Sequence, residues 1–219
     1  MKPASVTARP GRPPDPDIEP RVLNATLEIY AEVGWAGFTM DAVARRARVG
    51  KAALYRRWES REKLIVGALA SLTTPVMTET TGSLREDLLA MCVRTLRAQQ
   101  SRDGLVGLRA QIEAKFYPEL FGQAMEDLGK QWRTMYRQFV LLAIDRGEIP
   151  QGTSPALVLD AVNGIVVNHV LSTPIDKMPA LLEDAPRYAE RVVDFVLSSI
   201  GYRPAGGAGA TLDTDGTPT

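Results

Sequence analysis

The sequence predicts an all-α protein with two helical domains between two irregular ends. Apolar residues recur at helical spacing, and no stretch sustains the alternation of apolar and polar residues that is typical of strands. Capping residues, glycines and prolines recur at intervals that suit about nine helices. We expect a three-helix domain with a helix-turn-helix at 20–65, a C-terminal helical domain at 66–202, and disordered ends at 1–19 and 203–219.

The first domain has local signals for each helix. The first helix is expected to follow Pro20 and to end at Gly34. Thr39 can cap a short second helix that carries Asp41 in its first turn, where the helix dipole favours an acid. The apolar stripe of the first helix is expected to be Leu23, Leu27, Tyr30 and Val33.

A tight turn follows the second helix. The run Arg48-Val49-Gly50 predicts this turn, and Lys51 to Trp58 predicts a third helix. Ser60 can cap a fourth helix that starts at Arg61. A helix, a three-residue turn and a second helix form the geometry of a helix-turn-helix.

The second domain has longer helices. Ser83 and Glu86 predict a capping box for a helix that runs to about Gln100. Pro118 is expected to open a long helix that ends at Gly147. Prolines also predict the starts of two further helices, at Pro155 after Ser154 and at Pro186, the latter helix ending at Gly201.

The charges are distributed unevenly although the net charge is zero. Through Lys63 the chain has 12 Lys or Arg against 8 Asp or Glu, a net charge of +4. The remainder has 14 against 18, a net charge of −4. This asymmetry indicates a polyanionic partner at the N-terminal end only.

Several functional classes find no support in the sequence. Cys92 is the only cysteine, so no disulfide can form within the chain. The longest apolar run, Phe139 to Ile144, is too short to span a bilayer, so we expect a cytoplasmic protein with no membrane partner. The single histidine, His169, excludes a multi-histidine metal site, and no nucleophile or phosphate-binding motif occurs. We therefore expect no enzyme activity, catalytic residue, metal or cofactor.

The third helix has two different faces. Leu54 and Trp58 fall on one side and are expected to anchor the helix to the second and first helices. Small side chains on the other side let a helix approach the major-groove floor, and basic side chains there can reach base edges or phosphates. This outer face consists of Lys51, Ala52, Ala53, Tyr55 and Arg56.

The segment "GFTMDAVARRARVGKAALYRRWESREKLI", residues 37–65, resembles the DNA-binding segment of the TetR family of bacterial transcriptional regulators. The match covers about 30 residues, or roughly 45 with the first helix. It consists of Phe38, Thr39, Val43, Ala44, Val49, Leu54, Tyr55, Trp58, Ser60, Arg61, Glu62 and Leu64. The resemblance implies that Thr39 and Tyr55 contact phosphate, that Lys51 and Ala53 lie at base edges, and that Arg61 clamps phosphate.

Two residues depart from the family pattern and leave the exact turn geometry open. Arg48 stands where a turn glycine is common, so it is expected to adopt positive φ at a cost of roughly 1 kcal/mol. Gly50 stands where serine is usual, which predicts a weaker cap for the third helix.

The two ends have the composition of disordered segments, with five prolines in the first 19 residues and Ala-Gly repeats after residue 203. Arg12 in "RPGRPP", residues 9–14, can lie in a narrow minor groove, as the N-terminal arms of other DNA-binding domains do. A solvated linker is the alternative.

The resemblance further implies a C-terminal domain that forms a homodimer and binds a small molecule. Two apolar helices, at 155–171 and 186–200, suit a four-helix dimer interface. The alternative is that both stripes face the core of their own chain. The interface residues are expected to be Val158, Val162, Ile165, Val166, Val170, Tyr188, Val192, Phe195 and Val196.

Candidate ligand residues combine aromatic, soft and polar side chains, although an ordinary core would have a similar composition. They are Met91, Cys92, Arg109, Phe116, Trp132, Tyr136, Asn163 and Asn168. His169 is expected in the core or interface, and Cys92 also fits plain packing.

The predicted function is a DNA-binding regulator, a repressor released from a pseudo-palindromic operator by a small, largely apolar ligand. Its partners would be double-stranded DNA, a second copy of the chain and the inducer. Binding would tilt the fourth helix and change the separation of the two recognition helices. The alternative is a helical small-molecule-binding or scaffold protein without specific operator recognition.

Overall fold

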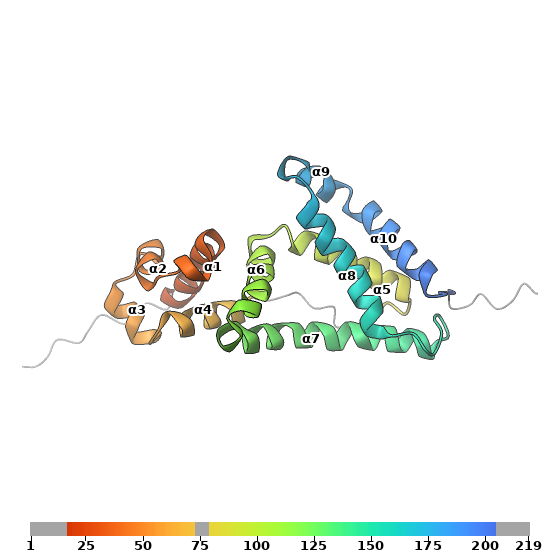
Figure 1. Ribbon diagram of the computed structural model, residues 1–219, viewed down its shortest axis with the longest axis horizontal. Helices are drawn as coiled ribbons and strands as arrows, with labels where there is room; N and C mark the ends of the chain where they lie inside the picture. The colour runs from red at the N-terminus through yellow and green to blue at the C-terminus, as the bar shows by residue number, and fades with distance from the viewer. Residues whose placement is uncertain (1–16, 73–78, 205–219) are drawn as a thin grey trace, which may run out of the picture. The chain divides into compact units, whose positions relative to one another are not determined.

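The computed structural model describes residues 17–72 and 79–204, and within these ranges every regular element is a helix (Figure 1). The all-α prediction is therefore confirmed. The chain divides into two compact units, Met1–Ser71 and Leu72–Thr219. The predicted domain boundaries stay predictions, and most of the predicted arm and tail lies outside the described residues.

The first unit is built around the contacts of its first helix with two others, α2 and α4. Tyr30, Phe38, Leu54 and Leu64 form part of its core and are fully buried. The burial of Leu54 confirms that this residue anchors the third helix. The helices of this unit are α1 (Ile18–Gly37), α2 (Met40–Ala47), α3 (Lys51–Arg57) and α4 (Arg61–Ala70).

The first helix differs from its prediction in two ways. Gly34 interrupts the helical geometry with a φ of 64°, as its predicted role at the helix end requires, but helical turns continue to Gly37. The predicted stripe was wrong in part, because Leu23 is only half-buried and Val33 is exposed. The spacing of Val22, Ala25 and Ile29 is equally helical, and it is these residues that face the core.

The second unit has one core shared by four helices. Helices α5, α8 and α10 pack against one another, α7 packs against α5 and α8, and α6 packs mainly on α7. Neither α6 nor the short segment at η1 and α9 was predicted. The elements are α5 (Leu84–Ala98), α6 (Arg102–Phe116), α7 (Pro118–Asp145), α8 (Pro155–Ser172), η1 (Ile175–Lys177), α9 (Met178–Glu183) and α10 (Ala185–Ser199).

The turn between α5 and α6 depends on a glycine. Ser101 caps α6 by accepting a hydrogen bond from the Gly104 amide at 3.0 Å. A Cβ at Gly104 would lie 1.8 Å from the carbonyl oxygen of Ala98, so no other residue fits there without moving the backbone. Ser101 is a favoured N-cap residue and was therefore a local sequence signal for the start of α6.

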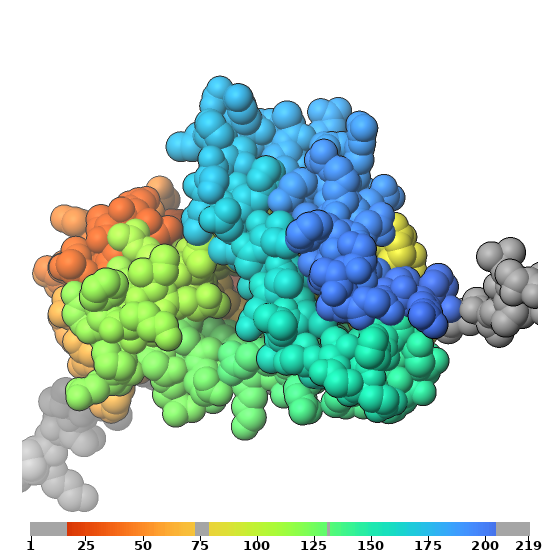
Figure 2. Space-filling view, turned by 45° about the vertical axis from the view of Figure 1, so that its right-hand side comes forward, coloured from red at the N-terminus to blue at the C-terminus, as the bar shows by residue number. Residues whose placement is uncertain are grey.

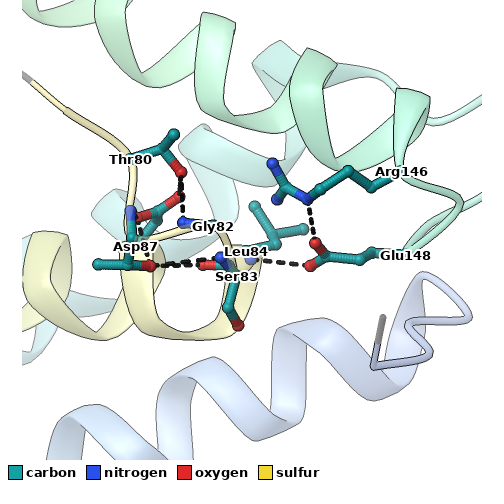
Figure 3. A network of polar contacts seen from close by, with 8 residues as sticks. Thr80, Gly82, Ser83, Leu84, Asp87, Arg146 and Glu148 are labelled. Atoms are coloured by element: carbon teal, nitrogen blue, oxygen red, sulfur yellow. Dashed lines mark hydrogen bonds and ion pairs between the residues drawn. The ribbon is translucent and has the colours of Figure 1, made fainter. Parts of the chain in front are cut away.

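The start of α5 is held by a network of polar contacts that we call the α5 clasp, made of Thr80, Thr81, Leu84, Asp87, Arg146 and Glu148 (Figure 3). The predicted capping box was wrong, because Ser83 begins the helix without a side-chain cap. The Leu84 amide instead donates to Oε2 of Glu148 at 2.8 Å. A residue just beyond α7 therefore caps α5.

Both carboxylates of the clasp are buried and fully engaged. Asp87 accepts hydrogen bonds from the Thr80 hydroxyl at 2.5 Å and from the Thr81 amide at 2.7 Å. Glu148 forms an ion pair with Arg146, and its backbone oxygen accepts from the Arg203 amide at 2.7 Å. The clasp thus joins the start of α5, the end of α7 and the chain beyond α10.

Candidate nucleic-acid interface

The helix-turn-helix consists of α2, a turn and α3. The Thr39 hydroxyl caps α2 by accepting a hydrogen bond from the Ala42 amide at 3.2 Å. Arg48 adopts the left-handed conformation with φ 55° and ψ 45°, as predicted. Gly50 is the N-cap of α3 and provides no side-chain hydrogen bond, which confirms the weak cap.

We expect that replacing Arg48 with glycine stabilises the first unit by about 1 kcal/mol, because glycine adopts positive φ without the Cβ penalty. Urea denaturation of the full chain measures this change. Arg45→Gly, in the helical part of α2, is the control and should destabilise by about 1 kcal/mol. Equal losses in both variants would contradict the prediction.

The outer face of α3 is open to solvent. Lys51, Ala52 and Arg56 are exposed and Tyr55 is 50% exposed, whereas Leu54 on the opposite face is fully buried. Ala53 is half-buried and is therefore less accessible to a base edge than its neighbours. The face has the small and basic side chains that entry into the major groove requires.

A hollow of about 430 Å³ lies beside this face, which we call the α2–α4 hollow. It is placed at the N-terminal end of α2, whose backbone amides and dipole favour an anion. The structure brings together here the three residues expected to contact phosphate, Thr39, Tyr55 and Arg61. The complete lining is Phe38, Thr39, Met40, Asp41, Tyr55 and Arg61.

Three contacts hold the guanidinium of Arg61. It donates to the carbonyl oxygen of Phe38 at 3.1 Å and lies 4.2 Å from the centre of the Trp35 ring. It also pairs with Glu62 at 3.2 Å. A cation fixed in this way loses little side-chain entropy when it binds a phosphate.

Lys51 is paired with an acid, which the sequence did not reveal. Its ammonium lies 2.5 Å from Oδ2 of Asp41 in the first turn of α2. Each residue had its own local explanation, Lys51 as a DNA contact and Asp41 as a dipole partner. Their pairing depends on the angle between α2 and α3, which the sequence does not give.

A second ionic cluster braces the unit away from the proposed DNA contacts. Arg46 donates to Glu28 and Glu32 of α1 at 3.0 Å each. Its hydrogen bonds, that with Glu32 first, raise the pKa of Arg46, and the same bond lowers the pKa of Glu32. The expected minor-groove residue Arg12 lies outside the described residues.

Comparisons with known proteins identify the family. Residues 22–68 match the bacterial regulatory proteins of the tetR family, and residues 78–196 match the tetracyclin repressor-like C-terminal domain. The chain belongs to the TetR family. It is therefore a DNA-binding transcriptional regulator, and neither the enzyme interpretation nor the scaffold alternative is supported.

Individual TetR-family relatives agree with this assignment. The HTH-type transcriptional regulator YdeS of Bacillus subtilis is 27% identical over 74% of this chain and 83% of its own. The DNA-binding transcriptional repressor TetR of Mycobacteroides abscessus is 33% identical over 48% of this chain and 50% of its own. FadR of Bacillus subtilis, solved with stearoyl-CoA, shares the fold with a TM-score of 0.61 and 16% identity, over 82% and 98% of the two chains.

Most of the expected interface residues of this TetR-family chain lie in its own core. Their side chains are covered by α5, α7 and the neighbouring helices, so they cannot also form a surface for a second subunit. Their burial agrees with the alternative interpretation of the two stripes, and the residues are Val158, Val162, Val166, Val170, Val192 and Val196. Ile165 and Tyr188 are half-buried and Phe195 is exposed.

Both α8 and α10 also expose large apolar side chains, although most exposed residues of α10 are charged or polar. Leu157 and Leu171 of α8 are 68% and 60% exposed, and Phe195 of α10 is 67% exposed. The two helices lie side by side, and Figure 2 shows both on one face of the second unit. By length and composition α8 is the one described helix that could cross a membrane, which is weak evidence because core helices share that composition.

The structure does not gather the expected ligand residues into one cavity. Met91, Cys92 and Tyr136 are core residues, with Tyr136 packed 5.0 Å from Trp132 between ring centres. Phe116 is 74% exposed and Asn168 is exposed, whereas Arg109 and Asn163 are half-buried. His169 is half-buried and stacks on Tyr188 at 4.3 Å, which fits its expected place beside the core.

An open groove on α5 was missed. Its volume is about 550 Å³, and it lies on the side of α5 opposite Met91 and Cys92. No sequence signal distinguished this face of α5 from an ordinary helix surface, because leucine, valine and arginine at helical spacing are common on a half-exposed helix. The groove is lined by Thr81, Glu86, Leu89, Ala90, Val93, Arg94 and Arg97.

Within the described ranges, no three His, Cys, Asp or Glu residues lie close enough together to hold a metal ion.

Burial gives Cys92 a testable property, since it raises the pKa of the thiol to about 12. The folded protein therefore keeps this proton at pH 8, and its stability is expected to fall above pH 9, where the unfolded state releases it. We expect Cys92 to react with a disulfide reagent at pH 8 at least 100-fold more slowly in the native protein than in urea. Equal rates in the two states would contradict its burial.

Proposed function

We propose that this TetR-family regulator is a cytoplasmic homodimeric repressor that binds a pseudo-palindromic operator and leaves it when a small ligand binds the second unit. The observation that carries the DNA-binding part is the α2–α4 hollow, because it combines a helix N-terminus with Thr39, Tyr55 and Arg61. These three groups suit one phosphate oxygen cluster. The name of the repressor from Mycobacteroides abscessus favours repression over activation.

Each α3 of the dimer would enter the major groove of one half-site, about 34–36 Å from the other. Lys51 and Arg56 would contact base edges or phosphates, and Ala52 would allow close approach to the groove floor. Arg12 remains a candidate for the minor groove.

Selection of genomic fragments by the purified protein, followed by fluorescence anisotropy at several salt concentrations, tests the proposal. A short pseudo-palindrome bound at about 10⁻⁸ M or tighter, with affinity that falls steeply in salt, is the expected result. Weak and equal binding to every duplex would overturn operator recognition.

The dimer is proposed to form through the outer faces of α8 and α10, supported by their exposed Leu157, Leu171 and Phe195. Two helices from each subunit would build a four-helix interface. Phe195→Asp is expected to weaken the dimer at least 100-fold, because the carboxylate would be buried without a partner. Sedimentation equilibrium measures the shift, and Ile112→Asp on the exposed side of α6 is the matched control. If the Phe195→Asp variant is still fully dimeric, the dimer interface does not include Phe195 and the proposed location is wrong.

The ligand is proposed to bind the α5 groove, where Leu89 and Val93 offer apolar surface and Arg94 and Arg97 lie towards one end. Such a lining suits a molecule with an apolar body and an anionic end. The solved complex of FadR with stearoyl-CoA is an example of that chemistry in this fold. A fatty acid series that releases operator from the wild type but not from Val93→Trp supports the proposal, and equal release from both would overturn it.

A further inference from the structure

Asp41 places a negative charge beside the proposed phosphate site. It lines the α2–α4 hollow together with Thr39, Tyr55 and Arg61. A carboxylate at this place repels a phosphate and weakens binding to any duplex. A role of Asp41 in DNA binding must therefore act through another residue.

That residue is Lys51, the first residue of α3 and the only cation in its first turn. Its ammonium lies 2.5 Å from Oδ2 of Asp41, and it is not among the residues that line the hollow. One of its three N–H groups faces Asp41, so two remain to point elsewhere. Arg56 and Arg57 lie at the other end of α3.

Without this pairing, the ammonium of Lys51 would be drawn to a DNA phosphate and away from the base edges. Its four-carbon stem is flexible, and a phosphate held in the hollow would attract the ammonium wherever the protein binds DNA. Contacts with phosphate carry no sequence information, whereas contacts with guanine acceptors do. The carboxylate that lines the hollow competes with the phosphate for Lys51.

We propose that Asp41 is a specificity-determining positioning residue, which holds the Lys51 ammonium at the start of α3 for base edges and away from the phosphate backbone. Asp41 lowers the affinity for unrelated DNA and preserves the base preference at the position that Lys51 contacts. The inference rests on the proposed DNA-binding function.

The test is a double-mutant cycle on the full-length protein with randomised half-site duplexes. Asp41→Asn is expected to bind an unrelated duplex several-fold more tightly and to steepen the salt dependence by about two units per dimer, one new phosphate contact per half-site. Its base preference at the Lys51 position should fall to that of Lys51→Ala. In the Lys51→Ala background, Asp41→Asn should change no base preference.

Two variants separate this effect from general charge and from folding. Glu59→Gln removes the same charge and releases Lys63 from a similar exposed pair, and it should leave base preference unchanged. Asp41→Glu keeps the carboxylate and should retain most of the preference. An Asp41→Asn variant with wild-type base preference would overturn this inference but not the proposed DNA-binding function. A wild-type protein that selects no sequence would instead overturn the proposed function.

Discussion

Replacing Arg61 with alanine is expected to lower the affinity of the dimer for DNA by about 100-fold or more. Each half-site would lose one charge-assisted contact with a phosphate, and two contacts of about 1.5 kcal/mol give that factor. The loss should be similar for operator and unrelated duplexes, because phosphates carry no sequence information. The salt slope should become shallower by about two units per dimer.

The surroundings of Arg61 explain why this cation should matter more than other arginines of the first unit. The Phe38 carbonyl and the Trp35 ring fix its guanidinium at the edge of the α2–α4 hollow. Arg61→Lys keeps the charge but not the planar group that stacks, so we expect an intermediate affinity. Anisotropy titrations at three salt concentrations measure these effects.

Arg45→Ala is the matched control, since this exposed cation lies in the last turn of α2 and does not line the hollow. It should change the affinity by less than about threefold. If Arg61→Ala binds DNA with the full wild-type affinity, Arg61 does not contact the DNA. A loss confined to the operator would make it a base-reading residue instead.

The sequence predicted the DNA-binding unit better than the second unit because its signals are local. The Thr39 cap, the strained Arg48 and the uncapped start of α3 each depend on neighbours within four residues. The pair of Lys51 and Asp41 spans ten residues and two helices, so no local rule predicts it. The same limit applies to the α2–α4 hollow, although the family resemblance implied a phosphate contact for each of Thr39, Tyr55 and Arg61.

In the second unit, the periodicity of apolar residues identified the buried side of each helix but not the element that covers it. Val158 and Val192 are buried, as their spacing predicts, but the same spacing fits a subunit interface and a core equally well. Only the packing of α5 against both of these helices shows that these side chains are covered within their own chain. The exposed Leu157 and Phe195 follow the same helical rules on the opposite faces.

The capping box at Ser83 and Glu86 shows how a distant residue can override a local pattern. Glu148 lies 64 residues from Leu84 in sequence, yet its carboxylate accepts the amide that begins α5 (Figure 3). A buried carboxylate that accepts an amide and pairs with Arg146 leaves no need for a serine cap. The removal of the Glu148 carboxylate should therefore reduce the stability of the second unit far more than the loss of a surface cap would.

Replacing Glu148 with alanine is expected to destabilise the second unit by about 3 kcal/mol. The change leaves the buried Leu84 amide without an acceptor and removes the partner of the half-buried Arg146 guanidinium. Such losses are large because the remaining group stays desolvated. Urea denaturation measures the stability, and hydrogen exchange at Leu84 reports the lost bond directly.

Glu148→Gln separates the two contributions, since its amide oxygen can still accept from Leu84 while the charge that faces Arg146 is lost. We expect about half the cost of alanine, with Leu84 still protected from exchange. Asp145→Ala, an exposed acid at the end of α7, should change the stability by less than about 0.5 kcal/mol. If Glu148→Ala is as mild as Asp145→Ala, the clasp does not hold α5. The joining of α5, α7 and the chain after α10 would then rest on their apolar contacts alone.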